Sequence, residues 1–275
     1  HPVAHSLSPV FQSAAFASSG LDVSYSAWDT TTEALAGRLV SLRASEYLGA
    51  NVTIPHKEAV IPLLDELGGL SAKVGAVNTI VNRSGRLFGF NTDGMGLVAA
   101  LRNESRFDPA GRSVLLIGAG GAARGIAFAL AEARVGSIAI SNRSQPRAER
   151  LVADILSSGF RPVNAVTPLA SLAPYDVVVN CTSIGMHGSG TEEALPVELA
   201  AARPGTLVVD IVYAPEHTPL LRAAEAAGLP TLGGLPMLIY QGALAFELWT
   251  GISAPVEVMF DAARKALDAR RPVTR

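Results

Sequence analysis

The sequence has very little cysteine and few histidines, which limits both its redox chemistry and its metal chemistry. Cys181 is the single cysteine among 275 residues, so no disulfide can form within the chain, and this composition suits a reducing cytosol. The histidines, at positions 1, 5, 56, 187 and 217, show no paired spacing and have no cysteine cluster beside them. Because a zinc site needs such ligands gathered together, we predict no metal centre.

Charge is also scarce, and the two signs nearly balance. Charged residues make up 17% and hydrophobic residues 49%, which is typical of a well-packed α/β protein and not of a disordered one. A formal net charge of −2 gives no general attraction to nucleic acid or to an anionic membrane. The longest apolar stretch, residues 114–131, contains three glycines before Arg124, and it reads as strand, turn and helix. We therefore expect neither nucleic acid nor a membrane among its partners.

Two polar stretches stand out in the first third of the chain. Residues 49–58 read Gly-Ala-Asn-Val-Thr-Ile-Pro-His-Lys-Glu, and Pro55 is suited to opening a helix, where its missing N–H costs nothing. Lys57 would then lie in the first turn of a helix over 57–67, which the helix dipole disfavours. Residues 90–94 read Phe-Asn-Thr-Asp-Gly and predict Asp93 as the N-cap of a helix over 95–103. Considered alone, Lys57 would be an ordinary exposed lysine and Asp93 an ordinary N-cap.

The N-terminal region otherwise alternates predicted helices and strands. Helices are expected over 10–18 and 31–42 and a strand over 22–27, after which residues 47–52 lead into the first polar stretch. Residues 78–82 and 86–90, separated by Arg83-Ser84-Gly85, predict a β-hairpin. This alternation predicts a small, mostly parallel sheet that ends near residue 100. Residues 101–112 are rich in polar residues and contain proline and glycine, as expected of a connection between domains.

A glycine-rich turn dominates the middle of the chain. A predicted strand over 114–117 runs into Gly118-Ala-Gly120-Gly121-Ala-Ala123, and a predicted helix over 124–133 follows. This is the dinucleotide-binding fingerprint in its expected context, with Gly118 for the tight turn, Gly120 for approach of a pyrophosphate and Ala123 for close packing. Further strands are expected at 137–141, 162–166, 177–181, 207–212 and 230–232. Six strands in this rhythm predict a doubly wound sheet, and the Thr182–Met186 turn follows one of them.

The end of the second strand of that sheet predicts which nicotinamide cofactor is bound. NAD-specific sheets carry an acid there, about 20 residues beyond the glycines. This chain has Asn142-Arg143-Ser144 instead, with Arg147 one turn further on. An arginine can stack on the adenine and pair with a 2′-phosphate, and a second arginine and a serine hydroxyl can support it. The sequence therefore predicts NADP over NAD.

Six motifs resemble the shikimate dehydrogenase family in their order and spacing, and together they cover essentially the whole chain. They are residues 5–9, 51–58, 75–79, 91–94, 118–124 and 237–242. The resemblance implies an α/β protein with an N-terminal substrate-binding domain, residues 1–100, and a Rossmann domain, residues 101–235. C-terminal helices over 237–249 and 255–269 would pack back on the first domain, so that residues 236–275 complete it.

The resemblance also implies an activity. It is the reversible NADPH-dependent reduction of 3-dehydroshikimate to shikimate, a step of aromatic amino acid biosynthesis, by a cytoplasmic monomer or homodimer. In this reaction Lys57 would hydrogen-bond the reacting oxygen and stabilise its negative charge, while Asp93 would hold the lysine and accept from the same hydroxyl. A glutamine buried among apolar residues needs a partner, which for Gln241 is either backbone or a substrate hydroxyl.

The remaining site residues fall into two groups. By resemblance, the polar side chains expected to bind substrate are Ser6, Ser8, Thr53, Asn78, Tyr213 and Gln241; from the residues alone, one of the two serines is expected to cap the helix that follows. The cofactor is expected at Gly118, Gly120, Gly121, Ala122, Ala123, Asn142, Arg143, Ser144, Arg147, Thr182, Met186 and Gly234.

Two alternatives compete with this function. Quinate and aminoshikimate dehydrogenases carry nearly the same motifs, because their substrates differ by a hydroxyl or an amine on one ring. A non-catalytic nucleotide-binding sensor on the same scaffold would require the acid–base pair to be lost. Since Lys57 and Asp93 both stand in intact motifs, the sequence favours an enzyme.

Overall fold

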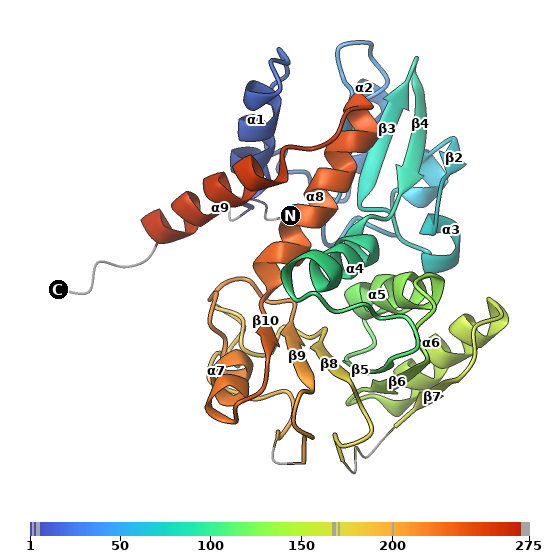
Figure 1. Cartoon of the computed structure of the whole chain (residues 1–275). Helices are drawn as coiled ribbons and strands as arrows, with labels where there is room; N and C mark the ends of the chain where they lie inside the picture. Colours follow the sequence, from blue (N-terminus) through green and yellow to red (C-terminus); the bar gives the residue numbers. More distant parts are fainter. Residues whose placement is uncertain (2, 4–5, 167–168, 170, 200, 271–275) are drawn as a thin grey trace. The chain divides into compact units, whose positions relative to one another are not determined.

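The computed structural model describes residues 1–270 except 2, 4, 5, 167, 168, 170 and 200, and the chain divides into two compact units (Figure 1). Unit 1 comprises residues 1–92 and 239–275, and unit 2 comprises residues 93–238. The domain limits proposed from sequence, at 100 and 236, lie a few residues from these divisions and stay a prediction. Within the described part of the chain, no helix combines the length and the apolar composition that a membrane crossing requires.

Unit 2 is a doubly wound parallel sheet, as the sequence predicts. Its strand order is β10-β9-β8-β5-β6-β7, and the order reverses between β5 and β8, which both pair with their neighbours in parallel. The strands are β5 (Ser113–Ile117), β6 (Ser137–Ser141), β7 (Val163–Ala165), β8 (Val177–Asn180), β9 (Leu207–Asp210) and β10 (Thr231–Leu232). The helices that begin in this unit are α4 (Asp93–Glu104), α5 (Gly121–Glu132), α6 (Gln145–Ser157), α7 (Pro219–Ala226) and α8 (Gly234–Thr250).

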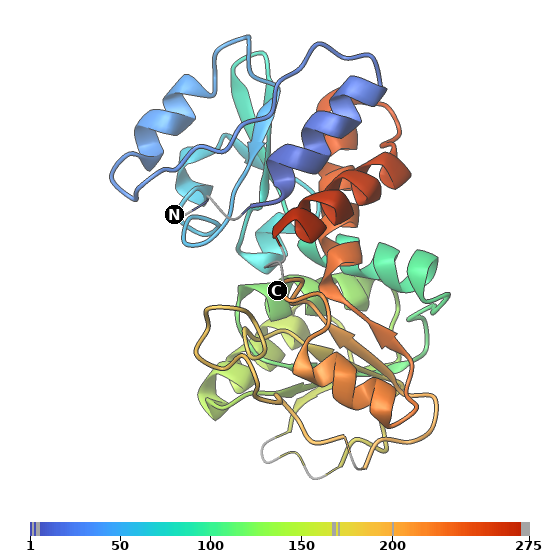
Figure 2. The same ribbon diagram turned by 90° about the vertical axis from the view of Figure 1, so that its left-hand side faces the viewer.

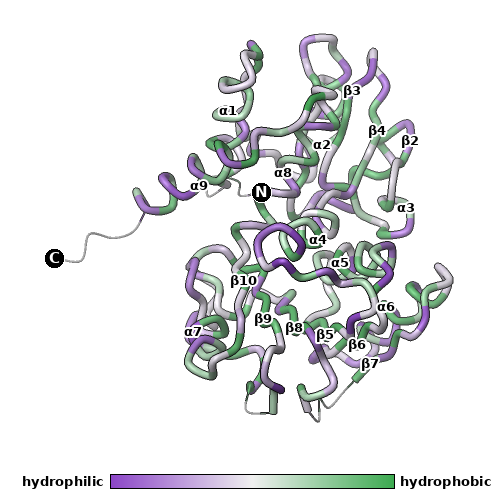
Figure 3. The backbone as a smooth tube through the Cα atoms, in the orientation of Figure 1, coloured by the Kyte–Doolittle hydropathy of each residue, from purple (hydrophilic) through white to green (hydrophobic). Residues whose placement is uncertain are grey.

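The central strands of unit 2 are apolar on both faces, as parallel strands between two helix layers must be. Leu115, Val178 and Val208 come from three neighbouring strands and share one buried cluster. Green, hydrophobic stretches mark β8 and β9 in Figure 3 before the polar residues that end them. Helix α4 packs against α5 at a point where no side chain fits. A Cβ on Gly94 would lie 2.1 Å from the carbonyl oxygen of Gly125, so the residue after Asp93 has to be glycine.

The sheet of unit 1 is mostly antiparallel, so the predicted mostly parallel sheet is wrong. Its order is β1 (Gly49–Asn51), β3 (Thr79–Arg83), β4 (Arg86–Phe90) and β2 (Glu66–Leu67). The β3–β4 hairpin was predicted correctly, and strands joined by so short a turn have to be antiparallel. Only the short β2 runs parallel to its neighbour β4 in this sheet.

Helices from both ends of the chain cover unit 1. α1 (Ser8–Ser18) packs along α9 (Val256–Arg270), and the two lie side by side in Figure 2 although they come from opposite ends of the sequence. Gln12 is fully buried and donates to the carbonyl of Gly242 at 2.9 Å. A Cβ on Gly242 would lie 2.5 Å from the ring of Phe11, so glycine lets α8 approach α1. The predicted return of the C-terminal helices to the first domain is confirmed.

Two predicted elements of unit 1 are wrong. No helix covers 57–67, where the chain forms turns, a short 3₁₀ helix (Ile61–Leu63) and β2. Pro62 interrupts the helical pattern, because it cannot donate a hydrogen bond in a helix interior. The Lys57 carbonyl accepts from Val77 N–H at 2.8 Å instead of from a helical amide. Residues 22–27, predicted as a strand, form none. Of the helix predicted over 31–42, only residues 35–41 are helical, as α2 (Leu35–Ser41). The helix α3 (Ser71–Val74) is a single turn.

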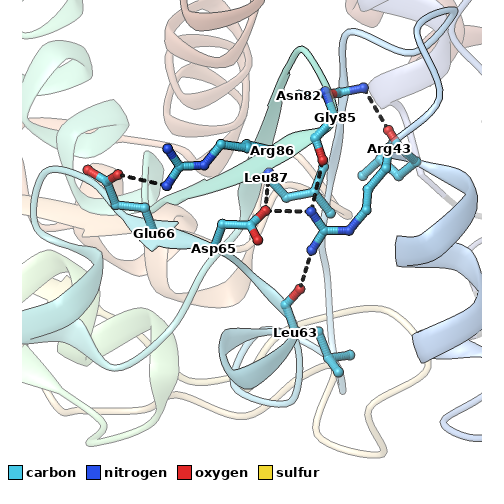
Figure 4. A network of polar contacts seen from close by, with 9 residues as sticks. Arg43, Leu63, Asp65, Glu66, Asn82, Gly85, Arg86 and Leu87 are labelled. Atoms are coloured by element: carbon cyan, nitrogen blue, oxygen red, sulfur yellow. Dashed lines mark hydrogen bonds and ion pairs between the residues drawn. The ribbon is translucent and has the colours of Figure 1, made fainter.

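A polar cluster around Arg43 ties the loops of unit 1 to its hairpin (Figure 4). Arg43 donates to Asp65 at 2.5 Å, to the Gly85 carbonyl at 2.9 Å and to the Leu63 carbonyl at 3.2 Å. Asp65 also accepts from the backbone N–H of Leu87 at 2.7 Å. The hydrogen bond from Arg43, together with that from Leu87, lowers the pKa of the Asp65 carboxyl below its ordinary value.

This lowered pKa predicts a pH dependence of stability. A carboxyl whose pKa is lower in the folded state stabilises the fold above its unfolded pKa, and that contribution is lost as the pH falls through the folded pKa. Asp65→Asn should therefore be less stable than the parent near neutral pH, and the gap should close on acidification. Urea midpoints at neutral pH and at about pH 3 measure it. Arg102→Ala, which removes an exposed pair with Asp108, is the control. A gap that stays constant across this range would contradict the prediction.

Candidate active site

In unit 1, a group of buried polar side chains lies where β3 begins and β4 ends. Asn78 donates through Nδ2 to Thr92 Oγ1 at 2.9 Å and to Gln241 Oε1 at 3.3 Å. Its Oδ1 accepts from the Thr92 backbone N–H at 2.8 Å and from Thr79 Oγ1 at 3.0 Å. All four side chains are at most 9% exposed. The structure therefore brings together Asn78 and Gln241, two of the predicted substrate-binding residues.

The Asn51–Lys57 segment lies beside this group. Val52 N–H donates to the carbonyl of Asn78 at 2.8 Å, and the carbonyl of Lys57 accepts from Val77 at 2.8 Å. The segment is thus held at both ends to Val77 and Asn78, which directly precede β3. Lys57 is partly buried and Thr53 is exposed.

Ser6 and Ser8 flank the buried Leu7 at the start of α1. Ser6 Oγ accepts from the backbone N–H of Ser8, the first residue of the helix, at 3.2 Å. The N-cap position is Leu7 and has no side-chain cap, so the predicted capping by one of the two serines is wrong. The bond from Ser8 leaves the Ser6 hydroxyl proton to other acceptors. Both serines are partly buried.

Asp93 opens α4 in unit 2, and the predicted start of that helix was two residues late. Its carboxylate lies in the first turn, where the helix dipole favours an anion. Asp93 follows directly on Thr92, which binds Asn78, and precedes Gly94, which fits against α5. The residues on either side of Asp93 are therefore both fixed, Thr92 by its hydrogen bond to Asn78 and Gly94 by the packing of α4 on α5.

The glycine turn of unit 2 has the form that a dinucleotide needs. Gly118 has φ +113°, and a Cβ there would lie 3.1 Å from Thr182 Cγ2. At Gly120 and Gly121 a Cβ would meet open space, which leaves the backbone open to a phosphate at the N-terminus of α5. Ala122 is partly buried and Ala123 is fully buried. The observed turn therefore fits a pyrophosphate.

The turn after β6 carries the predicted adenosine-phosphate residues on its surface. Asn142 Nδ2 donates to the carbonyl of Ser144 at 2.9 Å, and Ser144 precedes α6. The side chains of Arg143 and Arg147 are exposed. Two cations at one helix N-terminus are costly for the helix itself, because they oppose its dipole, and a bound phosphate would reverse that cost.

A buried network holds the loops at the carboxyl ends of β8 and β9. Asp210 is fully buried and accepts from Asn180 at 3.0 Å, from Val212 N–H at 3.0 Å and from Thr218 at 2.7 Å. Burial raises the pKa of Asp210, and these hydrogen bonds oppose the rise. Asn180 Oδ1 accepts from the Thr182 hydroxyl at 2.7 Å. The network thereby fixes the turn of Thr182 and the backbone just before Tyr213.

The last predicted cofactor residues also lie in unit 2. Met186 is 40% exposed at the end of the turn that Asn180 holds. Gly234 begins α8, and a Cβ there would lie 2.3 Å from the carbonyl oxygen of Ile211. This glycine is therefore required for packing, whatever it contacts in a complex. Among the residues that the structure describes, no three His, Cys, Asp or Glu side chains gather as metal ligands would.

Sequence reasoning missed several polar residues that the structure ties to these positions. Asn51 and Thr92 stand inside motifs that were recognised, so their amide and hydroxyl were a usable signal. Asn180 and Asp210 end apolar strands, and a polar residue at such a strand end is also readable. Tyr25 offered no signal, because it lies in a segment that was taken for a strand.

A chain that combines a doubly wound sheet and an open glycine turn with a lysine, an aspartate and a cluster of buried amides has the features of a nicotinamide-dependent dehydrogenase. Family models match most of the chain. They are described as the shikimate dehydrogenase substrate binding domain (residues 1–80), shikimate / quinate 5-dehydrogenase (residues 101–219) and the shikimate 5'-dehydrogenase C-terminal domain (residues 234–264). The chain belongs to the shikimate dehydrogenase family.

Individual relatives agree with this assignment. The shikimate dehydrogenase (NADP(+)) of Moorella thermoacetica is 46% identical over 275 residues, which cover 98% of this chain and 92% of that protein. The Thermus thermophilus shikimate 5-dehydrogenase, solved with NADP(H) and shikimate, has a TM-score of 0.87 at 42% identity and 97% coverage of both chains. The quinate dehydrogenase of Corynebacterium glutamicum, solved with NAD, is more distant, with a TM-score of 0.83 at 29% identity, covering 96% of this chain and 95% of that one.

Proposed function

We propose that the chain is an NADP-dependent shikimate dehydrogenase, which interconverts 3-dehydroshikimate and shikimate in aromatic amino acid biosynthesis. The observation that carries the proposal is the pairing of an open glycine turn and an arginine-bearing second turn in unit 2 with the Asn78–Gln241 amide group in unit 1. Relatives that bear this name align over almost the full chain. We place the enzyme in the cytoplasm, as a monomer or a homodimer.

The residues of this chain would hold the cofactor at three places. The backbone of Gly120 and Gly121 would bind the pyrophosphate, and Arg143 with Arg147 would bind the 2′-phosphate. Thr182, Met186 and Gly234 would face the nicotinamide end, and Asn142 and Ser144 would shape the adenosine end. Bound NADP supplies the hydride chemistry.

Lys57 and Asp93 would manage the hydroxyl proton and the charge on the reacting oxygen. The lysine ammonium donates a hydrogen bond to that oxygen and stabilises negative charge as it develops. Asp93 accepts from the same hydroxyl and orients the lysine. The hydroxyl proton can pass to either group.

The remaining polar residues would recognise the ring acid. Ser6 and Ser8 donate hydrogen bonds from their hydroxyls to its carboxylate, while other amide and hydroxyl side chains bind the ring hydroxyls. The side chains proposed to bind the ring hydroxyls are those of Thr53, Asn78, Tyr213 and Gln241. Each ring hydroxyl can donate one hydrogen bond and accept two, and amide and hydroxyl side chains supply both kinds of partner.

The proposed function predicts a ranking of substrates and cofactors. Initial rates on shikimate and quinate with NADP and with NAD, followed through the absorbance of the reduced nicotinamide, measure it. We expect the highest kcat/KM for shikimate with NADP. Quinate has an extra ring hydroxyl that this site would have to accommodate, so it should be the poorer substrate. A protein that binds NADP and turns over neither acid would overturn the proposal, and a preference for quinate would move it to the quinate dehydrogenases.

A further inference from the structure

Tyr25 lies in the irregular segment between α1 and α2, and its side chain reaches the end of β1. Its ring packs against Trp249 of α8, with the ring centroids 6.0 Å apart, and its hydroxyl donates to Asn51 Oδ1 at 2.8 Å. Trp249 is itself held by a hydrogen bond from Nε1 to the carbonyl of Ile80 at 2.9 Å. The position of the Tyr25 hydroxyl is therefore set by packing at one end of the ring and by a hydrogen bond at the other.

The donors and acceptors around Tyr25 allow one arrangement of protons. Asn51 Nδ2 donates to the carbonyl of Asn78 and to Thr79 Oγ1, both at 3.1 Å. A backbone carbonyl can only accept, which fixes the Asn51 amide and turns its oxygen toward Tyr25. The single phenolic proton goes to that oxygen. Burial raises the pKa of the Tyr25 phenol and the nearby Ser8 side chain opposes that rise, as a hydroxyl does when it faces the phenolic oxygen as a donor.

The same bonds lead on to the amide group of the candidate site. Thr79 Oγ1 donates to Asn78 Oδ1 at 3.0 Å, and Asn78 Nδ2 donates to Gln241 Oε1 at 3.3 Å. Ser8, at the start of α1, is thus joined to Asn78 and Gln241 through Tyr25 and Asn51. Without Tyr25 the two ends of the recognition site would have no such polar link.

We propose that Tyr25 is a positioning residue for recognition of the ring acid, and that it holds Ser8 and Asn51 in the arrangement that receives substrate. This inference rests on the proposed function and deepens it. In the free protein the Ser8 proton rests on the Tyr25 oxygen. A substrate carboxylate is a stronger, charged acceptor, so it draws that proton by rotation about one bond while the Ser8 oxygen stays in place.

Tyr25→Phe tests the proposal by removing one oxygen while keeping the ring on Trp249. Ser8 and Asn51 each lose a fixed partner, and both become free to bind water or to rotate, so binding of substrate has to order them again. We expect the KM for shikimate to rise about tenfold, the size of effect that one or two such hydrogen bonds produce. kcat should fall less than about threefold and the KM for NADP should stay unchanged, because the substitution leaves Lys57, Asp93 and the proposed cofactor residues of unit 2 intact.

Two further variants separate positioning from a general loss of structure. Tyr47→Phe is the matched control, since Tyr47 also packs against a tryptophan of unit 1, Trp28, with centroids 5.3 Å apart. It should leave the KM for shikimate unchanged. In a Ser8→Ala background, Tyr25→Phe should raise the KM by less than about threefold, because the donor that it positions is already gone.

The outcomes are distinct. An unchanged or lower KM for shikimate in Tyr25→Phe, or the same change in Tyr47→Phe, overturns the positioning role, as does an effect of Tyr25→Phe that persists in full without the Ser8 hydroxyl. A rise in the KM for NADP together with a lowered melting temperature would mark a purely structural role and would overturn it as well. Failure of the proposed function shows itself separately, as a parent enzyme that does not turn over shikimate.

Discussion

Lys57→Ala should lower kcat for shikimate oxidation by roughly 10²-fold or more, the range expected when a group that stabilises charge on the reacting oxygen is removed. Its stability should change little. The hydrogen bond from Val77 N–H to this residue is accepted by the Lys57 backbone carbonyl, which the substitution keeps. The KM for NADP should also stay near the parent value, because the expected cofactor contacts lie in unit 2.

Steady-state kinetics and a thermal melt on the same preparation check this prediction. Lys73→Ala is the matched control, since Lys73 is an exposed lysine of the same unit, on α3, and it should leave kcat unchanged. Asp93→Asn should show a loss of similar order, as it removes the carboxylate and keeps the shape. A near-normal kcat in Lys57→Ala would rule out the catalytic assignment.

Arg143→Ala is expected to weaken NADP binding by about 1.5–3 kcal/mol, typical of a charged hydrogen-bonding group, which is roughly 10- to 150-fold in affinity. NAD lacks the 2′-phosphate, so its binding should change little. The effect should be selective because Arg143 is exposed in the structure, with its backbone in the turn that Asn142 holds. Removing its side chain therefore leaves the glycine turn as it is.

Measuring kcat/KM with both cofactors in the parent and in the variant tests the assignment. Arg150→Ala, an exposed arginine further along α6, is the control and should affect neither cofactor. A parent that prefers NAD, or equal losses with NADP and NAD, would show that Arg143 does not read the phosphate.

The sequence predicted unit 2 far better than unit 1, and the reason is physical. Strand β6 was predicted over its full observed range, and β5, β8 and β9 within two residues, because parallel strands buried on both faces are continuous apolar runs between turns. The glycine turn needs its residues for backbone geometry, as the φ of +113° at Gly118 illustrates. Local rules therefore determine most of this unit.

Unit 1 depends on contacts that local patterns do not contain. The predicted helix over 57–67 gives way to pairing of Asp65 N–H with the carbonyl of Leu87, far along the chain. The segment of Tyr25 alternates like a strand but is held by a ring on Trp249 instead of by a ladder. The Asn78–Gln241 hydrogen bond joins residues that are 163 positions apart in the sequence. Family motifs named both residues, although no spacing could show that they touch.

The discontinuity of unit 1 has a consequence for how the protein emerges from the ribosome. Residues 1–92 are made first, but α8 and α9, which supply Trp249 and the carbonyl that Gln12 binds, are made last. Unit 2 is encoded without interruption, so it can fold during synthesis, while the earlier segment waits with Phe11 and Phe16 uncovered. Nascent chains stalled before α8 should therefore recruit chaperones, and the substrate half should become protease-resistant only after α8 and α9 have left the ribosome.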